Sequence, residues 1–444
     1  MKKALAVVMS SVLILSVAGC GGSDGGSSDG GKEKESKVYE TVSINESELD
    51  YPDVSLLGGE KNIELKVWAP DNEIPITRAQ ADEFMKHYPD GTFNNISVEP
   101  MDDSDLIESV GNNPDECADV FSFVYSSFSK LVSGKMLSPV SDDFINEVCA
   151  NNGPHYYNAM TVGNSVSAYP RGTDRFLSVV YDKTAVSDEE ASTLEGALSA
   201  CKKLGKHFVM DCSDGFSASA FLLTGGLTPD GLESDGTTQK LNDYDENAVV
   251  VTLETFSKLM KDYKGTFVSC DSTRITEEFN SKNAAAGIDG SWNMAADKIA
   301  FGENFGVTKL PTVNVTGEDR QMISLYGNRY LGVYSNTVFP KAAQALAYFL
   351  SSKNCQMQRE QALFGTTSNK YYSVEEAEKD PGIIAEMMQS AYSVYEAKLS
   401  ESFLPSAAKL GESISAESWN PDDKQATQEL LHQTVDSITG KDVL

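Results

Sequence analysis

Histidines and paired cysteines are scarce in this chain of 444 residues. The four histidines, His87, His155, His207 and His432, are scattered, and no two have the spacing of metal ligands or catalytic partners. The seven cysteines include no C-x-x-C pair, so no zinc site is expected. The six that follow Cys20 could form disulfides or remain buried thiols, and spacing alone does not decide between these states.

The familiar catalytic motifs are absent as well. The sequence has no G-x-S-x-G elbow, no H-E-x-x-H pair and no P-loop, and the glycine-rich "TGGLTPDG" lacks the lysine and hydroxyl residue of a phosphate-binding loop. Paired carboxylates carry no information in a chain with 66 acidic residues. We therefore predict a protein that is not an enzyme and needs neither a cofactor nor a metal.

Basic residues are outnumbered. There are 36 lysines and arginines against 66 acidic residues, and the formal net charge is −30. A chain this acidic does not fit nucleic-acid binding or electrostatic docking on anionic lipid. About 400 residues with 40% hydrophobic composition are enough for two domains with ordinary cores.

Long apolar runs are limited to the first residues. Lys2 and Lys3 precede an apolar stretch over 4–19, which is too short for a stable spanning helix and reads as a secretory signal. The stretch ends in "VAGC", which resembles a bacterial lipobox. That resemblance implies a signal peptide over 1–19 that is cleaved before Cys20, with lipid attached to Cys20.

The next stretch, "GGSDGGSSDGGKEKES", contains nothing that could be buried, and we predict a disordered tether over 20–60. More than one acyl chain is enough to hold such a protein at a membrane without a spanning helix. We expect a soluble, monomeric body on the extracellular face of a bacterial cell membrane.

The remaining chain alternates strand and helix patterns. Residues 63–68 and 120–125 read as strands, 284–290 as a buried strand, and 77–88 as a helix that begins with a Thr77–Gln80 capping box. The acidic stretch 228–247 is predicted to be a solvated surface loop. This alternation predicts α/β layers with mostly parallel sheets.

Several segments in this order resemble extracellular solute-binding lipoproteins of bacterial ABC importers, in the branch that binds maltose and other oligosaccharides. These segments are the lipobox and tether, "ADVFSFVYSSFSKLVSGKMLSPV", "VSAYPRGTDRFLSVVYDK", "FNSKNAAAGIDGSWNMAA", and "FGVTKLPTVN" followed by "ISLYGNRYLGVYSNT". The resemblance covers the chain from about residue 61 to its end.

The resemblance implies a two-lobed periplasmic-binding-protein-like fold, with a helix-flanked and mostly parallel sheet in each lobe and a hinge between the lobes. It assigns 61–172 and 326–353 to the N-terminal lobe, and 174–323 and 354–444 to the C-terminal lobe. Ligands would bind in the cleft, and closure would present the loaded protein to the permease subunits.

Trp292 is the leading ligand-binding candidate. It follows the predicted strand 284–290, and ligands of α/β lobes lie beyond the carboxyl ends of such strands. A flat indole can stack on the apolar face of a pyranose ring. The family has a tryptophan in its G-x-W turn, which stacks on sugar there; the alternative is that Trp292 covers its own core.

Further candidates follow other strand ends and the return crossing between lobes. The resemblance and the strand positions together suggest as ligand-binding residues Asp71, Asn72, Glu73, Phe123, Tyr125, Asp174, Arg175, Phe216, Tyr326, Asn328, Arg329 and Trp419. Asp174 and Arg175 could equally form a structural bridge at the hinge.

One departure from the family bears on the ligand. Maltose-binding proteins have a Trp-x-x-Asp-Arg pattern after the strand that matches "ADVFSF", whereas this chain has Phe-Val-Tyr-Ser-Ser over 123–127. A missing acid and arginine put maltose itself in doubt and leave a longer oligosaccharide open. The alternatives are a metal- or anion-binding importer subunit, suggested by the doublets Tyr156-Tyr157 and Tyr371-Tyr372, or a surface glycan-binding or hydrolysing module.

Overall fold

A computed structural model describes residues 39 and 41–441 except 153, 236 and 364–379, and a few side chains within these ranges are not described. The predicted signal peptide and Cys20 lie outside the described residues. Part of the predicted tether is packed: the ring of Tyr51 stacks on His87 with centroids 3.8 Å apart, and Leu57 is buried. The packed chain therefore begins before residue 60.

The first sheet is built around parallel strands. Its order is β17–β16–β3–β1–β2, with β6 also paired to β16. β1 is parallel to β2 and β3, while β16 is antiparallel to β3 and β6. The strands are β1 (Ile63–Ala69), β2 (Phe93–Pro100), β3 (Val120–Val124), β6 (Tyr169–Arg175), β16 (Ser324–Val333) and β17 (Ser393–Tyr395).

The second sheet has the order β11–β8–β12–β7–β13. β8 is parallel to β11 and β12, and β7 is antiparallel to β12 and β13. The strands are β7 (Leu177–Asp182), β8 (His207–Met210), β11 (Phe267–Ser269), β12 (Ala284–Gly290) and β13 (Phe305–Lys309). Strand β12 lies where residues 284–290 were predicted to form a buried strand.

Helices cover both sheets. Those that accompany the first sheet are α1 (Ile74–His87), α2 (Asp103–Asn112), α3 (Phe128–Ser133), α4 (Ile145–Asn151), α5 (Pro154–Ala159), α12 (Pro340–Leu350) and α13 (Lys353–Leu363). Those that accompany the second are α6 (Asp188–Ala191), α7 (Leu194–Lys203), α8 (Gly215–Thr224), α9 (Glu246–Asp262), α10 (Ser272–Asn280), α11 (Met294–Phe301), α15 (Pro381–Ser390), α16 (Phe403–Ser415) and α17 (Lys424–Ile438).

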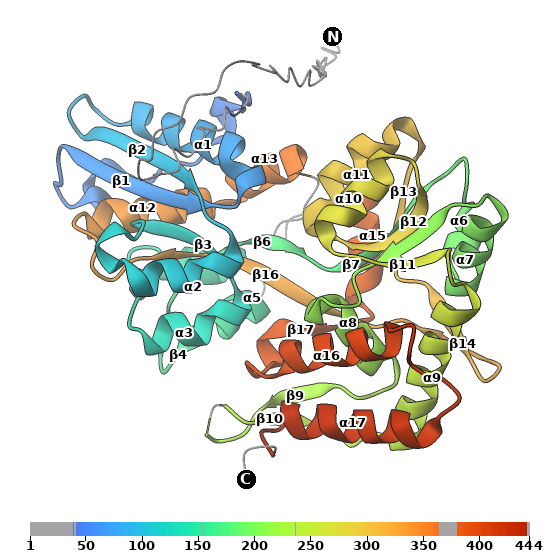
Figure 1. The fold of residues 1–444 in the computed structure, drawn as a ribbon. Helices are drawn as coiled ribbons and strands as arrows, with labels where there is room; N and C mark the ends of the chain where they lie inside the picture. The colour runs from blue at the N-terminus through green and yellow to red at the C-terminus, as the bar shows by residue number, and fades with distance from the viewer. Residues whose placement is uncertain (1–38, 40, 153, 236, 364–379, 442–444) are drawn as a thin grey trace, which may run out of the picture. The chain divides into compact units, whose positions relative to one another are not determined.

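The second sheet has cores on both faces because its strand residues alternate. Val179 packs in a core with α7, α8, α9 and α16, while Val180 packs in the core that includes residues of α10, α11 and α15. Helices on both faces are expected when a sheet contains buried parallel strands. Strands β6 and β16 run between the two sheets (Figure 1). β16 contributes Leu325 to the core of the second sheet and Tyr330 to that of the first.

Two predictions of local structure were wrong. Helix α1 begins at Ile74 rather than at a capping box, because Pro75 stands at its start, where a fixed φ and a missing N–H cost nothing. Thr77 and Gln80 are buried inside the helix. The predicted acidic loop contains a hairpin of β9 (Pro229–Leu232) and β10 (Gln239–Leu241), and Asp245 caps α9 by accepting from the backbone N–H of Asn247.

The six cysteines after Cys20 are all free thiols, which decides between the two states that spacing left open. Burial raises the pKa of Cys201, Cys212 and Cys355 to about 12, so these thiols are inert core residues. Within the part of the chain that the structure describes, no helix is long and apolar enough to span a membrane. The remaining short hairpins are β4 (Thr161–Val162) with β5 (Ser165–Val166), and β14 (Thr312–Val315) with β15 (Glu318–Gln321).

Candidate functional site

The carboxyl end of β1 places one charged residue in a buried ion pair. After Pro70 the chain forms a 3-10 turn, η3 (Asp71–Glu73), which leads directly into α1. The side chain of Glu73 is buried and accepts a hydrogen bond from Nη1 of Arg171 on β6 at 2.8 Å. A buried carboxylate is tolerated only with such a partner, so this pair holds the first turn of α1 against β6.

The carboxyl end of β12 carries Trp292 in the 3-10 turn η6 (Ser291–Asn293). A Cβ atom on Gly290 would lie 2.2 Å from the indole ring, so the glycine is what allows the ring to fold back over the strand end. Ser291 ties the turn to the start of β7: its N–H donates to the carbonyl of Phe176 at 3.0 Å, and its hydroxyl accepts from the N–H of Phe176 at 3.2 Å. The small residues before Trp292 therefore form a close-packed support for its ring.

A cation lies against two aromatic rings beside this turn. Phe216, near the start of α8, meets Trp292 edge to face with ring centroids 5.6 Å apart. The guanidinium of Arg175 lies 4.7 Å from the centre of the Phe216 ring and 5.8 Å from that of Trp292. It also forms an ion pair of 3.5 Å with Glu396, which lies in the 3-10 turn η8 (Glu396–Lys398). These contacts hold the Trp292 indole in one orientation.

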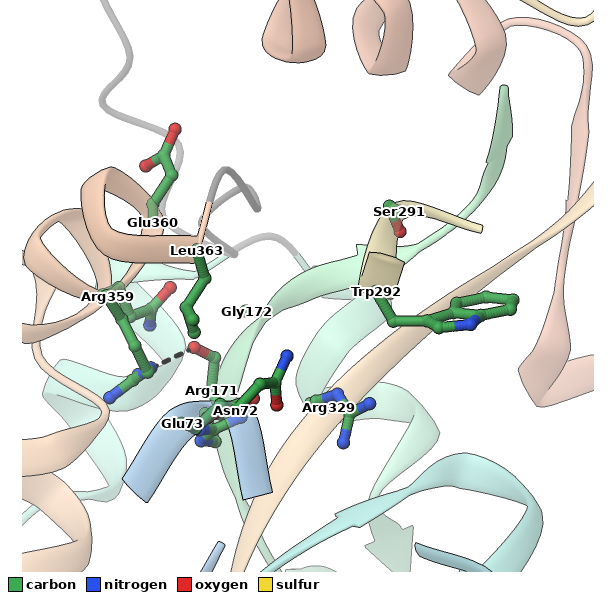
Figure 2. Close-up of a pocket in the computed structure, with 11 residues that line it drawn as sticks. Asn72, Glu73, Arg171, Gly172, Ser291, Trp292, Arg329, Arg359, Glu360 and Leu363 are labelled. Atoms are coloured by element: carbon green, nitrogen blue, oxygen red, sulfur yellow. Dashed lines mark hydrogen bonds and ion pairs between the residues drawn. The ribbon is translucent and has the colours of Figure 1, made fainter. Parts of the chain in front are cut away.

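A pocket, here called the central pocket, lies where these elements meet (Figure 2). Its walls come from the ends of β1 and β12, from β6 and β16, and from α13. The lining residues are Asn72, Glu73, Arg171, Gly172, Ser291, Trp292, Arg329, Gln356, Arg359, Glu360 and Leu363. Figure 2 shows Asn72 and Arg329 between the Glu73–Arg171 pair and Trp292. Planar polar groups and one indole therefore surround a single space.

Helix α13 supplies the wall of the central pocket opposite Trp292. Its Arg359 is buried and donates to Oε1 of Gln80 at 3.2 Å and to the carbonyl oxygens of Arg171 at 3.1 Å and Leu350 at 3.0 Å. Gln356 donates to the carbonyl oxygen of Pro170 at 3.3 Å. These bonds anchor the polar wall to both α1 and β6.

A second pocket, here called the tyrosine pocket, lies against the opposite side of β16. Side chains of a strand alternate between faces, so Arg329 lines the central pocket while its neighbours Asn328 and Tyr330 line the other. The volume of the tyrosine pocket is about 290 Å³. Its lining residues are Tyr125, Asn158, Ala159, Tyr326, Asn328, Tyr330, Tyr395, Glu396 and Ala397.

The hydroxyls of Tyr125 and Tyr395 in this pocket remain protonated at neutral pH. Burial, and then the charge of Glu396, raises the pKa of Tyr125, and burial followed by the charge of Glu386 raises the pKa of Tyr395. Tyr326 donates a hydrogen bond to Oε1 of Glu386. Neutral phenols can both donate to and accept from hydroxyl groups, so this pocket also suits an uncharged polar solute.

The structure brings most of the predicted residues to these two pockets. Asn72, Glu73, Trp292 and Arg329 line the central pocket. Tyr125, Tyr326 and Asn328 line the tyrosine pocket. Arg175 lies between them through its contacts with Trp292 and Glu396, and Phe216 supports Trp292 from a position that is only 1% exposed.

Three other predicted residues lie elsewhere. Phe123 is fully buried in the core of the first sheet, with its ring centroid 5.7 Å from that of Tyr330. Trp419 packs at the edge of the second core beside α9, where its carbonyl accepts from Nζ of Lys261 at 3.2 Å. Asp71 is half-buried in η3 and lines neither pocket. Phe123 and Trp419 pack as core residues.

For some of the predicted ligand residues the structure does not describe the side chain. The backbone of Asp174 is part of β6, but its side chain lies outside the described part of the structure, as does that of Tyr156. Tyr371 and Tyr372 lie wholly outside it. Within the described ranges, no group of three or more His, Cys, Asp or Glu residues could hold a metal ion.

Sequence reasoning missed the α13 wall and Arg171. A signal existed: Gln356, Arg359 and Glu360 are spaced by three and four residues, which places them on one face of a helix. A polar face of this kind on a helix that also carries the buried Cys355 indicates a polar pocket. Arg171 stood within the "AYPRGT" segment that carried the hinge resemblance.

Comparison with known protein families adds a decisive match. The profile of the family described as bacterial extracellular solute-binding protein matches residues 79–385. The chain belongs to this family. The match runs from within helix α1 to within helix α15, so it includes the whole second sheet but not strands β1 and β17 of the first. Most residues of the central pocket fall inside it, whereas Asn72 and Glu73 precede it and Tyr395 and Glu396 of the tyrosine pocket follow it.

Solved structures give the same fold. A maltodextrin-binding protein from L. casei BL23, solved without ligand, is 22% identical with a TM-score of 0.70, and the match covers 85% of this chain and 99% of that chain. A maltotriose-binding protein from Thermus thermophilus, bound with maltotriose, is 17% identical with a TM-score of 0.69 over 85% of this chain and 99% of that one. A cyclo/maltodextrin-binding protein complexed with maltotetraose is 19% identical with a TM-score of 0.61 over 85% and 97%.

These matches confirm the predicted two-lobed periplasmic-binding-protein-like fold. The family and these structural neighbours are binding proteins, not enzymes, which confirms that prediction as well. None of the curated proteins matches the sequence significantly.

Proposed function

We propose that this solute-binding protein captures an oligosaccharide, of the malto-oligosaccharide type, in the space around the central pocket. The observation that carries the proposal is that the Trp292 indole lines the same pocket as Asn72 and Arg329. An indole face stacks on the axial C–H groups of a pyranose, and amide and guanidinium groups bind its hydroxyls. A sugar ring is bound by an aromatic ring that stacks on its C–H face and by planar polar groups beside it that bind its hydroxyls.

The structural neighbours support the sugar class. Their own ligands are maltotriose and maltotetraose, and another neighbour, with a TM-score of 0.75, was solved with acarbose. At identities near 20% the fold alone is shared, so the polar residues decide which sugar binds here. The central pocket has arginines at 171, 329 and 359, which is a different set from the Asp-Arg pair that maltose-binding proteins carry after the strand matching β3. A ligand longer than maltose suits this set.

The proposal includes a conformational step. The N-terminal lobe would comprise 61–172 and 326–363, extended beyond 353 because α13 bonds to α1 through Gln80 and Arg359. The C-terminal lobe would comprise 174–323 and the chain after 379. Residues from both lobes line the central pocket, so a ligand there favours the closed state by contacts that only closure completes.

The setting is the outer face of a bacterial membrane. We propose that Cys20 carries the lipid anchor and that the closed, loaded protein docks on the permease subunits of an ABC importer. Mutation of Cys20 to alanine should release the protein into the medium of cells that express it, while its ligand affinity stays unchanged. Retention of the Cys20→Ala protein on the membrane would contradict anchoring through this cysteine.

Isothermal titration calorimetry of the body from residue 39 onward tests the ligand. We expect saturable binding of maltotetraose and no binding of cellotetraose, which has the same sugar units with β linkages. Chromatography of the sugars after long incubation should show no shortened products, in contrast to a hydrolase. Binding of phosphate, an amino acid or ferric ion with no response to any oligosaccharide would overturn the carbohydrate proposal.

A further inference from the structure

A buried carboxylate closes the turn that carries Trp292. Oδ1 of Asp289 accepts from the N–H of Gly290 at 2.7 Å. Nδ2 of Asn293 donates to both carboxyl oxygens of Asp289, at 3.0 and 3.2 Å, and also to the hydroxyl of Ser272 at 2.6 Å. Asp289 therefore joins the two ends of the segment 289–293, with Trp292 inside it.

A second buried carboxyl lies behind the same turn. Asp297 is on the first turns of α11 and has no exposed surface, and neither of its oxygens has a hydrogen-bond partner among the described residues. An ionised carboxylate without donors is far too costly in such a place. A neutral carboxylic acid is the form that this environment tolerates.

The charged groups around Asp289 and Asp297 do not neutralise these two carboxyls. Asp211, in the loop after β8, adds negative charge. On α10, Glu278 is occupied by Arg274 at 2.7 Å and by His207 at 2.7 Å, and Asp271 caps the helix. Three other charged groups on elements around α11 have partners of their own: Lys282 contacts the carbonyl of Ala300, Lys309 of β13 contacts Gln321, and Asp182 of β7 contacts Thr184. No hydrogen bond or ion pair among the described residues joins a cation to Asp289 or Asp297.

The proton affinities agree with this geometry. Burial raises the pKa of Asp289 to about 7, against the opposing effect of its hydrogen bonds from Asn293 and Gly290. Burial, and then the neighbouring Asp289, raises the pKa of Asp297 well above its ordinary value. Two carboxyls that repel each other in a dry site lose their protons in separate steps.

We propose that Asp297 is a protonated positioning residue behind the binding turn, and that loss of its proton loosens this turn and weakens ligand binding as the pH rises. Asp289 can ionise without loosening the turn, because its oxygens already accept hydrogen bonds from Gly290 and Asn293. The proton from Asp297 passes to solvent, and the charge that remains is accommodated only if the turn shifts to admit water. The part that concerns ligand affinity rests on the proposed function. The part that concerns the turn does not.

The direction of the stability effect follows from linkage. The folded state holds these protons more tightly than the unfolded chain, in which an aspartate titrates near pH 4. The stabilisation is therefore complete below about pH 4 and is lost as the pH rises toward and through the raised values in the folded state. The protein should become less stable through the neutral range, in contrast to a protein whose aspartates are paired with cations.

The test is thermal unfolding of the wild type and of Asp297→Asn between about pH 5 and pH 9. Asparagine is uncharged at every pH and has nearly the shape of the protonated acid. We expect the unfolding midpoint of Asp297→Asn, relative to wild type, to rise steadily with pH. An infrared band of a protonated carboxyl group should be present in the wild type at pH 7 and weaker in the variant. A midpoint difference that is the same at every pH, or the absence of the band, would overturn the proposal.

Two further variants serve as a substitute test and as a control. Asp289→Asn retains an amide oxygen that can accept from Gly290 and Asn293, and it should also flatten the pH dependence; it replaces the first variant if Asp297→Asn does not fold. Asp230→Asn, at an exposed position, should leave the pH dependence unchanged. An equal effect of Asp230→Asn would show that general surface charge is responsible and would contradict the proposal.

Ligand affinity gives a separate readout. With maltotetraose as the probe, we expect the wild type to bind about tenfold more weakly at pH 8 than at pH 6 for each unit by which the bound ligand raises the pKa of Asp297. Asp297→Asn should bind nearly equally at both, because ionised Asp289 keeps its hydrogen bonds from Gly290 and Asn293. If no oligosaccharide binds at any pH, the proposed function fails, while the unfolding and infrared measurements still decide the state of Asp297. If the sugar binds without pH dependence, the coupling to the turn fails instead.

Discussion

Phe216 meets Trp292 edge to face, with ring centroids 5.6 Å apart and ring planes inclined by 79°. Phe216 is buried in the second core, whereas Trp292 lines the central pocket, so this contact joins the core to the candidate ligand surface. Edge-to-face pairs are favoured because the positive edge of one ring meets the negative face of the other. The orientation of the indole is therefore set by the core before any ligand arrives.

Removal of the Phe216 ring should affect both stability and binding. We expect Phe216→Ala to lower the free energy of unfolding by about 3–5 kcal/mol, because a large buried ring leaves a cavity. Trp292 should also become more accessible to acrylamide quenching, and affinity for the sugar should fall. Phe216→Leu, which retains most of the volume, should recover stability more fully than affinity. An unchanged fluorescence of Phe216→Ala would contradict the supporting role.

Phe123 provides a matched control in the first sheet. It is as deeply buried as Phe216 but packs against Phe128 and Tyr330, away from Trp292. Phe123→Ala should lose a comparable 3–5 kcal/mol of unfolding free energy. Ligand affinity per folded molecule and Trp292 quenching should stay as in the wild type. A specific loss of affinity with little loss of stability would instead restore Phe123 as a ligand residue.

The Arg175–Glu396 pair should show energetic coupling. Glu396 is only 2% exposed in its side chain and Arg175 14%, so the 3.5 Å contact is largely shielded from water. A double-mutant cycle with Arg175→Met and Glu396→Gln, measured by urea unfolding, should give a coupling energy of about 0.5–3 kcal/mol. A coupling indistinguishable from zero would mean that the arginine is held by the two aromatic rings alone.

The Glu73–Arg171 pair should be expensive to break on one side only. Glu73→Gln leaves a buried guanidinium without its counter-charge and should lower the free energy of unfolding by about 3–5 kcal/mol. Replacing both residues with apolar side chains, as in Glu73→Leu with Arg171→Met, should recover much of that loss. The exposed pair Lys86–Glu83 is the control, and Lys86→Met should have no measurable effect. Equal effects at the two sites would contradict the assigned burial.

The regular elements were largely predictable because their patterns are local. The run "AAAGIDG" predicted a buried strand, and β12 occupies the same residues. The start of α1 was missed because a capping pattern at Thr77 and Gln80 competed with the stronger preference of Pro75 for a first helical turn. Both outcomes follow from interactions within a few residues.

The site was only partly predictable because it depends on tertiary packing. Every residue of β3 is buried, so alternation could not show that Phe123 faces the core rather than a cleft. The contribution of α13 depends on its contact with α1, which no local pattern indicates. The burial of Asp297 without a partner is likewise a property of how α11 packs, since an aspartate near a helix start is ordinarily exposed.

The most direct test of the account is titration of intrinsic tryptophan fluorescence with maltotetraose in the wild type, Trp292→Ala and Trp419→Phe. Trp419 lies beside α9, away from the central pocket, so its replacement serves as the control. The account predicts a saturable change in the wild type and in Trp419→Phe, and loss of that change in Trp292→Ala, together with an affinity lower by about 2 kcal/mol, or roughly thirtyfold, in calorimetry. Full affinity of Trp292→Ala for the sugar would contradict the account and return Trp292 to a purely structural role.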